Sequence, residues 1–92
     1  MKLIIDIGGT RGRWYIVNKS IISSFETEGF NPFTSDISVL RKILGDLKNS
    51  FDFSSIKTIY YYGAGISSEN KIIEVKNLLH TFFVKSIIEL NS

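Results

Sequence analysis

Three segments in the first third of the chain carry the apolar patterns of β-strands. Lys2–Ile7 is almost continuously apolar, which is typical of a strand buried on both faces. Arg13–Asn18 is similar, whereas Ile21–Glu28 contains more polar residues, which favours an edge strand. Because only short turns separate the three segments, we expect them to pair as antiparallel neighbours.

Two later segments carry apolar residues at helical spacing. The first follows Ser35 or Asp36, either of which can cap a helix, and its pattern ends near residues 49–52. The second follows Ser67 or Ser68. The apolar stripes consist of Ile37, Leu40, Leu44 and Leu47 in the first helix and of Ile72, Val75, Leu79 and Phe82 in the second.

Strand patterns at Ile56–Tyr62 and Val84–Leu90 alternate with these helices. Strands joined through helices run parallel, and their crossovers are right-handed. The sequence therefore predicts an α/β fold of the order βββαβαβ, with a mixed five-stranded sheet of strand order 3-2-1-4-5 and both helices on one face. The other face would expose more contiguous apolar surface than soluble monomers usually do. We expect a segment beyond Ser92, a second copy of the chain or another protein to cover it.

Composition and charge narrow the class of protein. The length of 92 residues predicts a single domain, 1–92, and we expect it to be one part of a larger domain. The absence of cysteine excludes disulfides and thiolate metal sites. No apolar run is long enough for a secretory signal or a membrane span, so we expect a cytoplasmic protein without a membrane partner. The net charge of +2 is spread along the chain, so a nucleic-acid partner is not indicated.

The candidate chemistry lies in the stretch DIGGTRGRW, residues 6–14. An apolar strand ends on a carboxylate, Asp6, and runs into Gly8, Gly9 and Thr10. Backbone N–H groups of a glycine-rich turn can converge on a phosphate, and carboxylate oxygens suit Mg²⁺. A second glycine loop, residues 63–65, follows the fourth strand. Both loops lie at the C-terminal ends of parallel strands, where α/β sheets bind ligands.

Each of these residues also has a purely structural interpretation. Asp6 can cap its own loop, the glycines can shape turns, and Asn31 can be a pre-proline turn residue. His80 lies near the end of the second helix and is expected to be solvated. The chain has neither a GxxxxGK[ST] nor a GxGxxG pattern, which excludes P-loop and Rossmann sites.

Three stretches together resemble a known family. DIGGTRGRW resembles the first phosphate-binding hairpin of the ATPase superfamily of actin, hexokinase and the sugar kinases, whose pattern is Asp-x-Gly-x-Thr. ETEGFNPF (26–33) and IYYYGAGISSENK (59–71) resemble the N-acetylglucosamine kinase branch, which includes the benzoyl-CoA-reductase activator ATPases. The resemblance covers nearly all of the chain. It implies the ribonuclease-H-like N-terminal lobe of an ATP-dependent sugar kinase of the actin-like superfamily, without its C-terminal lobe.

The resemblance also implies roles in nucleotide binding. Asp6 matches the acid that organises Mg²⁺. The loop that holds the β- and γ-phosphates of ATP is matched by Gly8, Gly9 and Thr10. Arg11 and Arg13 depart from the family pattern, which often has Lys or a small polar residue and then an acid, so neither receives a role.

A sugar pocket and a catalytic base are implied as well. Asn31 matches a residue near the amino sugar, and Gly63, Ala64 and Gly65 match the wall of that pocket. The family's general base, an Asp after the fifth strand, is expected beyond Ser92, so no catalytic residue is assigned. Since loss of a base typically costs about 10²–10⁴-fold, we expect negligible kinase activity from this chain alone.

Other interpretations stay open. A type III pantothenate kinase begins with a similar strand and loop, although GFNPF and YYYGAG argue against it. A non-catalytic module that forms a homo-oligomer through its exposed sheet face is compatible with a kinase fragment. A ribonuclease-H-like nuclease needs clustered carboxylates for two metals, and no acid lies near YYYGAG.

Overall fold

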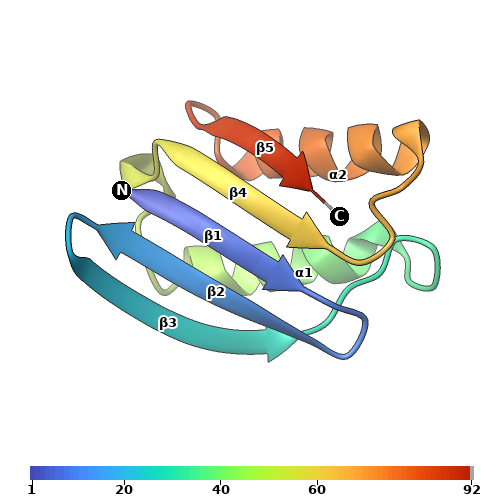
Figure 1. Cartoon of the computed structure of the whole chain (residues 1–92), viewed down its shortest axis with the longest axis horizontal. Coiled ribbons are helices and arrows are strands. Elements are labelled where there is room, and N and C mark those ends of the chain that lie inside the picture. The colour runs from blue at the N-terminus through green and yellow to red at the C-terminus, as the bar shows by residue number, and fades with distance from the viewer. Residues whose placement is uncertain (92) are drawn as a thin grey trace.

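The computed structural model describes residues 1–91, apart from the side chain of Ile21. Ser92, where the chain was expected to stop short of its catalytic base, lies outside the described residues. A single mixed sheet has the strand order β3-β2-β1-β4-β5, which confirms the predicted order (Figure 1). The strands are β1 (Lys2–Ile7), β2 (Arg11–Asn18), β3 (Ile21–Glu28), β4 (Thr58–Gly63) and β5 (Ile87–Asn91).

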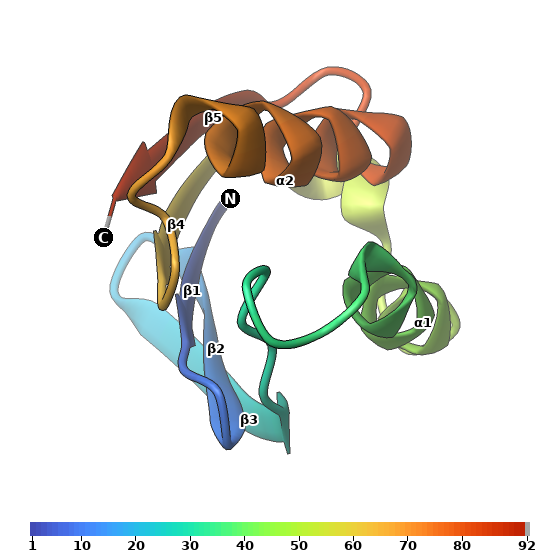
Figure 2. The ribbon, with the colours of Figure 1, turned by 90° about the vertical axis from the view of Figure 1, so that its right-hand side faces the viewer.

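Two α-helices, α1 (Ile37–Lys48) and α2 (Glu69–Phe82), pack on one face of this sheet, as predicted (Figure 2). Ser68 caps α2, because its hydroxyl accepts a hydrogen bond from the backbone N–H of Lys71 at 3.3 Å. Asp36 occupies the corresponding position of α1 but makes no side-chain cap bond to the backbone. No helix within residues 1–91 is long and apolar enough to cross a membrane.

Three strand starts differ from the prediction. β2 begins at Arg11 rather than at residue 13, and Arg11 already pairs with Glu28 of β3. β4 begins at Thr58, since Ile56 closes a 3-10 turn, Phe53–Ser55, that was not predicted. β5 begins at Ile87, and the apolar Val84 before it is 78% exposed in the connecting turn. In the last two cases, the apolar turn residues Ile56 and Val84 had extended the predicted strands at their N-terminal ends.

The core lies between the helices and the sheet. Alternate residues of the strands point into it, together with the buried stripes of both helices. The largest fully buried side chains are Trp14, Tyr61, Phe30, Phe83, Leu3, Ile5 and Ile7. This single layer of packed side chains fixes the sheet whose loop edge forms the candidate site.

The other face of the sheet corrects one prediction. Lys2–Ile7 was expected to be buried on both faces, but Lys2 and Asp6 are exposed and only Ile4 is half-buried there. Half-buried Tyr15, Val17 and Tyr60 from neighbouring strands lie around Ile4. The apolar surface of this face therefore consists of these half-buried residues in its middle and of exposed Ile22, Tyr62 and Ile87, and charged side chains interrupt it. A partner that covers the face stays a prediction.

Tyr61 gives a first test of the core. Its hydroxyl is buried without a hydrogen-bond partner among the described residues, and burial raises the pKa of Tyr61. Tyr61→Phe removes this group and keeps the ring. We therefore expect the free energy of unfolding in urea to stay the same or to rise by up to about 1 kcal/mol. If Tyr61→Phe instead lowered the free energy of unfolding by more than about 1 kcal/mol, the hydroxyl would have a hydrogen-bond partner. Tyr61→Ala, which should cost about 3–5 kcal/mol, calibrates the assay.

Candidate functional site

The hairpin between β1 and β2 is closed tightly at its base. The backbone N–H of Gly8 donates to the carbonyl oxygen of Arg11 at 3.0 Å, and Gly9 and Thr10 at the tip are exposed. A Cβ added at Gly8 or Gly9 would come no nearer than 3.8 Å to its closest neighbour. The packing within this chain therefore does not require glycine at either position. Since the Gly8 N–H is bonded within the hairpin, the exposed backbone of Gly9 and Thr10 at the tip is the part that a ligand such as a phosphate can reach.

The segment after β3 is bonded directly to this hairpin. The N–H of Gly29 donates to the carbonyl of Thr10 at 3.1 Å, and the N–H of Phe30 donates to the carbonyl of Gly8 at 2.9 Å. A Cβ at position 29 would overlap backbone atoms of residues 8–10. Gly29 therefore allows two backbone segments to touch, and it holds the hairpin against the loop that carries Asn31.

Asn31 begins a turn that leads toward α1. Its side-chain oxygen accepts a hydrogen bond from the N–H of Phe33 at 3.0 Å, and its carbonyl accepts from the N–H groups of Thr34 and Ser35. This is the pre-proline turn that the sequence left open as a structural role. The Cβ of Asn31 lies 4.0 Å from the position of a Cβ on Gly9, so the turn also lies beside the hairpin. Asn31 is therefore a turn residue and a neighbour of the phosphate-loop candidates at the same time.

The loop after β4 joins the same group. The N–H of Ala64 donates to the carbonyl of Ile7 at 3.0 Å, which ties residues 63–65 to the end of β1. Gly65 has a φ of +74°, and a Cβ there would overlap the side chain of Asn31 and approach Phe33 to 3.1 Å. Glycine is required at position 65 for both reasons. Gly63 has a simpler role, because it makes room for the ring of Tyr61.

Three loops that are distant in sequence thus meet at one edge of the sheet (Figure 2). They are the hairpin 8–10, the turn 29–33 and the loop 63–65, and hereafter they are called the loop cluster. The structure brings together the residues that the sequence analysis selected for phosphate and sugar binding. Their bonds run through the backbone, so the cluster is a preformed part of the fold.

Asp6 is the residue before the last of β1, and its side chain lies on the face of the sheet without helices. Its neighbours across the strands are Arg13 of β2 and Tyr62 of β4. The Nε of Arg13 lies 3.7 Å from Oε1 of Glu26, with both side chains more than half exposed. Arg13 is therefore paired with Glu26 of β3, on the side away from Asp6, and the Asp6 carboxylate is exposed to solvent.

The donor set around Asp6 fits a weakly held hard cation. Among residues 1–91 no group of three His, Cys, Asp or Glu side chains could hold a metal ion. Mg²⁺ usually keeps several waters and is held by one or two carboxylates together with the phosphates of a substrate. A single exposed carboxylate beside an exposed glycine loop agrees with this way of binding Mg²⁺. It does not agree with a nuclease site that holds two metals.

Phe33 is a residue that the sequence analysis did not select. Its ring is 56% exposed, lies against Gly65 and has the Nζ of Lys71 at 5.7 Å from its centroid. An exposed aromatic ring at a loop edge provides a flat apolar surface with a cation beside it. The signal in the sequence was the pair of Phe residues around Asn-Pro, but the pattern does not indicate which of them is buried.

The strand order and the loop cluster define a sugar-kinase-like α/β domain. Among solved structures, the chain is similar to the crystal structure of a Porphyromonas gingivalis protein described as a proposed N-acetylglucosamine kinase. The two share 29% sequence identity and a TM-score of 0.77, over 98% of this chain and 33% of that one. This likeness confirms the predicted resemblance, and the chain spans about a third of the length of that protein. No protein-family model and no curated protein matches the chain.

Proposed function

We propose that residues 1–92 form the N-terminal lobe of an ATP-dependent sugar kinase, with an amino sugar as the phosphoryl acceptor. The observation that carries this proposal is the loop cluster, in which the three stretches that resemble the family are joined by backbone hydrogen bonds. The likeness to a proposed N-acetylglucosamine kinase supports the same assignment. No observation favours the pantothenate kinase alternative.

The nucleotide end of this proposal rests on the hairpin. Gly9 and Thr10 would hold the terminal phosphates of ATP through their backbone N–H groups and the Thr10 hydroxyl, and Gly8, whose N–H bonds Arg11, would shape the loop around them. Asp6 would hold Mg²⁺, directly or through its waters. When bound, the metal offsets the negative charge that develops on the phosphates during transfer. The role of this chain is to position the phosphates, and the base that activates the sugar is expected from residues beyond Ser92.

The sugar end rests on the other two loops. Asn31 would contribute its side-chain amide N–H groups, because its oxygen already bonds Phe33 within the turn. Residues 63–65 would form a wall of the pocket, and the exposed ring of Phe33 would form an apolar surface for the sugar ring. These assignments place phosphate and sugar groups on adjacent loops, as transfer between them requires.

A titration that observes backbone amides tests both ends. Mg²⁺–ATP at millimolar concentration is expected to shift the amide resonances of residues 8–10, and N-acetylglucosamine those of residues 31 and 63–65. Asp6→Asn should remove the difference between ATP with Mg²⁺ and ATP alone, because the metal loses its ligand from the protein. Glu89→Gln, an exposed carboxylate on the same face, is the matched control and should leave that difference intact.

Two outcomes would each contradict one part of the proposal, the nucleotide site and the source of the catalytic base. Unshifted amides in residues 8–10 would leave the hairpin only its structural role. Robust ADP formation by the chain alone, with ATP and N-acetylglucosamine, would show that the account of the catalytic base is wrong. We expect that assay to stay at background.

A further inference from the structure

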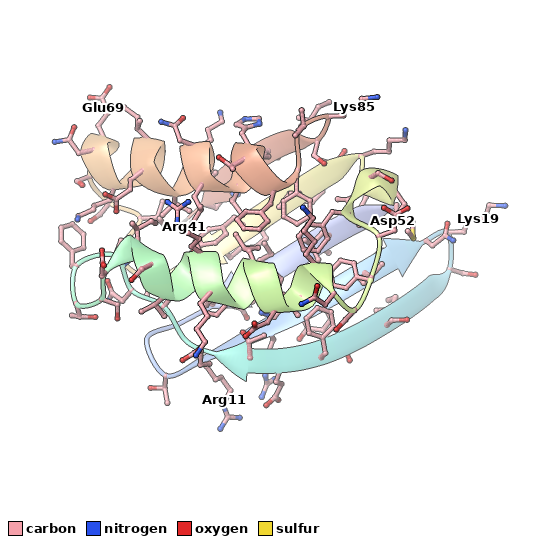
Figure 3. All side chains as sticks on the ribbon, turned by 180° about the vertical axis from the view of Figure 1, so that it is seen from behind. Arg11, Lys19, Arg41, Asp52, Glu69 and Lys85 are labelled. Atoms are coloured by element: carbon pink, nitrogen blue, oxygen red, sulfur yellow. The ribbon has the colours of Figure 1, made fainter. Side chains whose placement is uncertain are left out.

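A cleft lies at the end of the sheet opposite the loop cluster. It has a volume of about 580 Å³ and lies between the ends of α1 and α2, beside the 3-10 turn 53–55. Lys48, Lys57 and Lys85 line it, and hereafter it is called the lysine cleft. Figure 3 shows Lys85 and Asp52 at this end of the molecule and Glu69 at the other. Its size lies within the range of small-molecule sites.

The inner surface of the lysine cleft is aromatic. Phe51, Phe53 and Phe82 line it, and the rings of Phe51 and Phe53 lie 4.8 Å apart between centroids. Phe53 is stacked on buried Phe83 at 4.2 Å, so this surface is supported by the core. A packed aromatic surface below charged side chains suits a ligand with an apolar body.

The charges around the cleft are mainly positive, and its lysines have no acidic partner among the described residues. The one ion pair found among residues 1–91 joins Arg13 to Glu26, away from this end, so none of the three cleft lysines is paired. The one acid in the lining is Asp52, whose carboxylate accepts bonds from the hydroxyl of Ser54 at 2.7 Å and from its N–H at 2.9 Å. These bonds hold the pKa of Asp52 below its usual value, so it stays charged and bound to Ser54.

A simpler role for the lysines is to offset the helix dipoles, and the negative charge at the helix ends can be compared with the charge of the lysines. Both helices end at this cleft, and each C-terminus carries about half a negative charge. The two helix ends and Asp52 together do not balance three ammonium groups. A neighbouring cleft of about 390 Å³ adds Lys2 and Lys19 and shares Lys57. This end of the molecule therefore keeps an excess of positive charge.

The geometry points to a binding site in the lysine cleft for a small amphiphilic anion, in which a phosphate or carboxylate is joined to an aromatic or acyl body. The lysines would hold the anionic group, and the three phenylalanines would contact the apolar body. This site is independent of the loop cluster, which lies at the opposite edge, so the two proposals can fail separately.

The first test uses 8-anilinonaphthalene-1-sulfonate, an anion on an aromatic body. We expect saturable one-to-one binding by fluorescence, with amide shifts confined to residues 48–57 and 82–86. N-phenyl-1-naphthylamine, which lacks the sulfonate, should bind clearly more weakly. Equal binding of the neutral probe, shifts on the helix-free face of the sheet, or no saturation would overturn the site.

Charge-reversal variants locate the anion. Lys48→Glu with Lys85→Glu should weaken binding of the anionic probe about tenfold, since two attractive contacts become repulsive. Lys42→Glu with Lys76→Glu makes the same charge change on exposed helix positions outside the lining and should leave the affinity within about twofold. Equal weakening in both pairs would overturn the inference, because net charge alone would explain it. If the first pair fails to fold, Lys85→Gln serves in the same assay.

Competition then separates the two sources of such an anion. Phenyl phosphate and octanoate are titrated against the bound probe, each with the unmodified chain. Displacement by phenyl phosphate indicates an aromatic phosphate, and displacement by octanoate indicates an acyl carboxylate. Displacement by neither at millimolar concentration would overturn the assignment of an amphiphilic anion.

Discussion

Gly29→Ala is expected to lower the free energy of unfolding by about 3 kcal/mol, although it adds only one methyl group. The added Cβ would overlap backbone atoms of residues 8–10, which have no rotamer by which to move away. Relief requires the turn 29–33 to separate from the hairpin, and this breaks the bonds from Gly29 to Thr10 and from Phe30 to Gly8. Urea unfolding followed by circular dichroism measures the loss.

Gly45→Ala is the matched control for this variant. Gly45 lies within α1, and a Cβ there would meet no atom within 4 Å. Alanine is a better helix former than glycine, so this variant should be more stable by about 0.5–1 kcal/mol. If Gly29→Ala were as stable as the original chain, the contact between the turn and the hairpin would not be close, and the loop cluster would lose its main support.

The strand order could be predicted because it depends on local patterns and on chain connectivity. Short turns require antiparallel neighbours, helical connections require parallel ones, and the handedness of crossovers places both helices on one face. Strand starts were less accurate, since Val84 and Ile56 are apolar residues in turns and resemble strand residues in a linear pattern. The expected burial of β1 on both faces was wrong for a related reason. Lys2 and Asp6 already alternate with apolar residues, but the apolar run obscured that alternation.

The candidate site was predictable to the extent that its residues follow strand ends. Asp6 and the glycines of both loops lie at or directly after strand ends, and their roles in ligand binding stay a prediction. Gly29 and Phe33 were not singled out, because their importance arises from contacts across the fold. Gly29 touches residues 8–10, and Phe33 lies against Gly65. The lysine cleft could not be predicted either, since its three lysines are separated in sequence and gather only when both helices end at the same edge.

Trp14→Ala is expected to lower the free energy of unfolding by about 3–5 kcal/mol. Trp14 is fully buried in β2, and its ring stacks on Phe25 of β3 at 6.0 Å between centroids. Its Nε1–H donates to the hydroxyl of Thr27 at 2.8 Å. A domain of this length has only about 5–14 kcal/mol of stability in total, so the variant should be close to unfolding. Far-UV circular dichroism during urea titration gives the value, and Ile22→Ala, 64% exposed on the helix-free face, should change it by less than about 0.5 kcal/mol.

The hydrogen bond of Trp14 is expected to couple the packing of the core to the hairpin. Thr27 pairs with Gly12 across the strands, and a Cβ at Gly12 would lie 2.9 Å from the Thr27 hydroxyl oxygen, so glycine at position 12 gives that hydroxyl room to reach the indole. Thr27→Val leaves the buried indole N–H without its acceptor and should cost about 1–3 kcal/mol, whereas Trp14→Phe removes the donor and keeps an aromatic ring. With both changes, the loss should be smaller than the sum of the single losses by about 1 kcal/mol, because the bond between the indole and the hydroxyl is then lost only once, while the bond from the Thr27 hydroxyl to the carbonyl of Glu28 is lost in both backgrounds. Strict additivity would mean that the bond contributes nothing, and the anchoring of β2 beneath the phosphate-loop candidates would then rest on apolar packing alone.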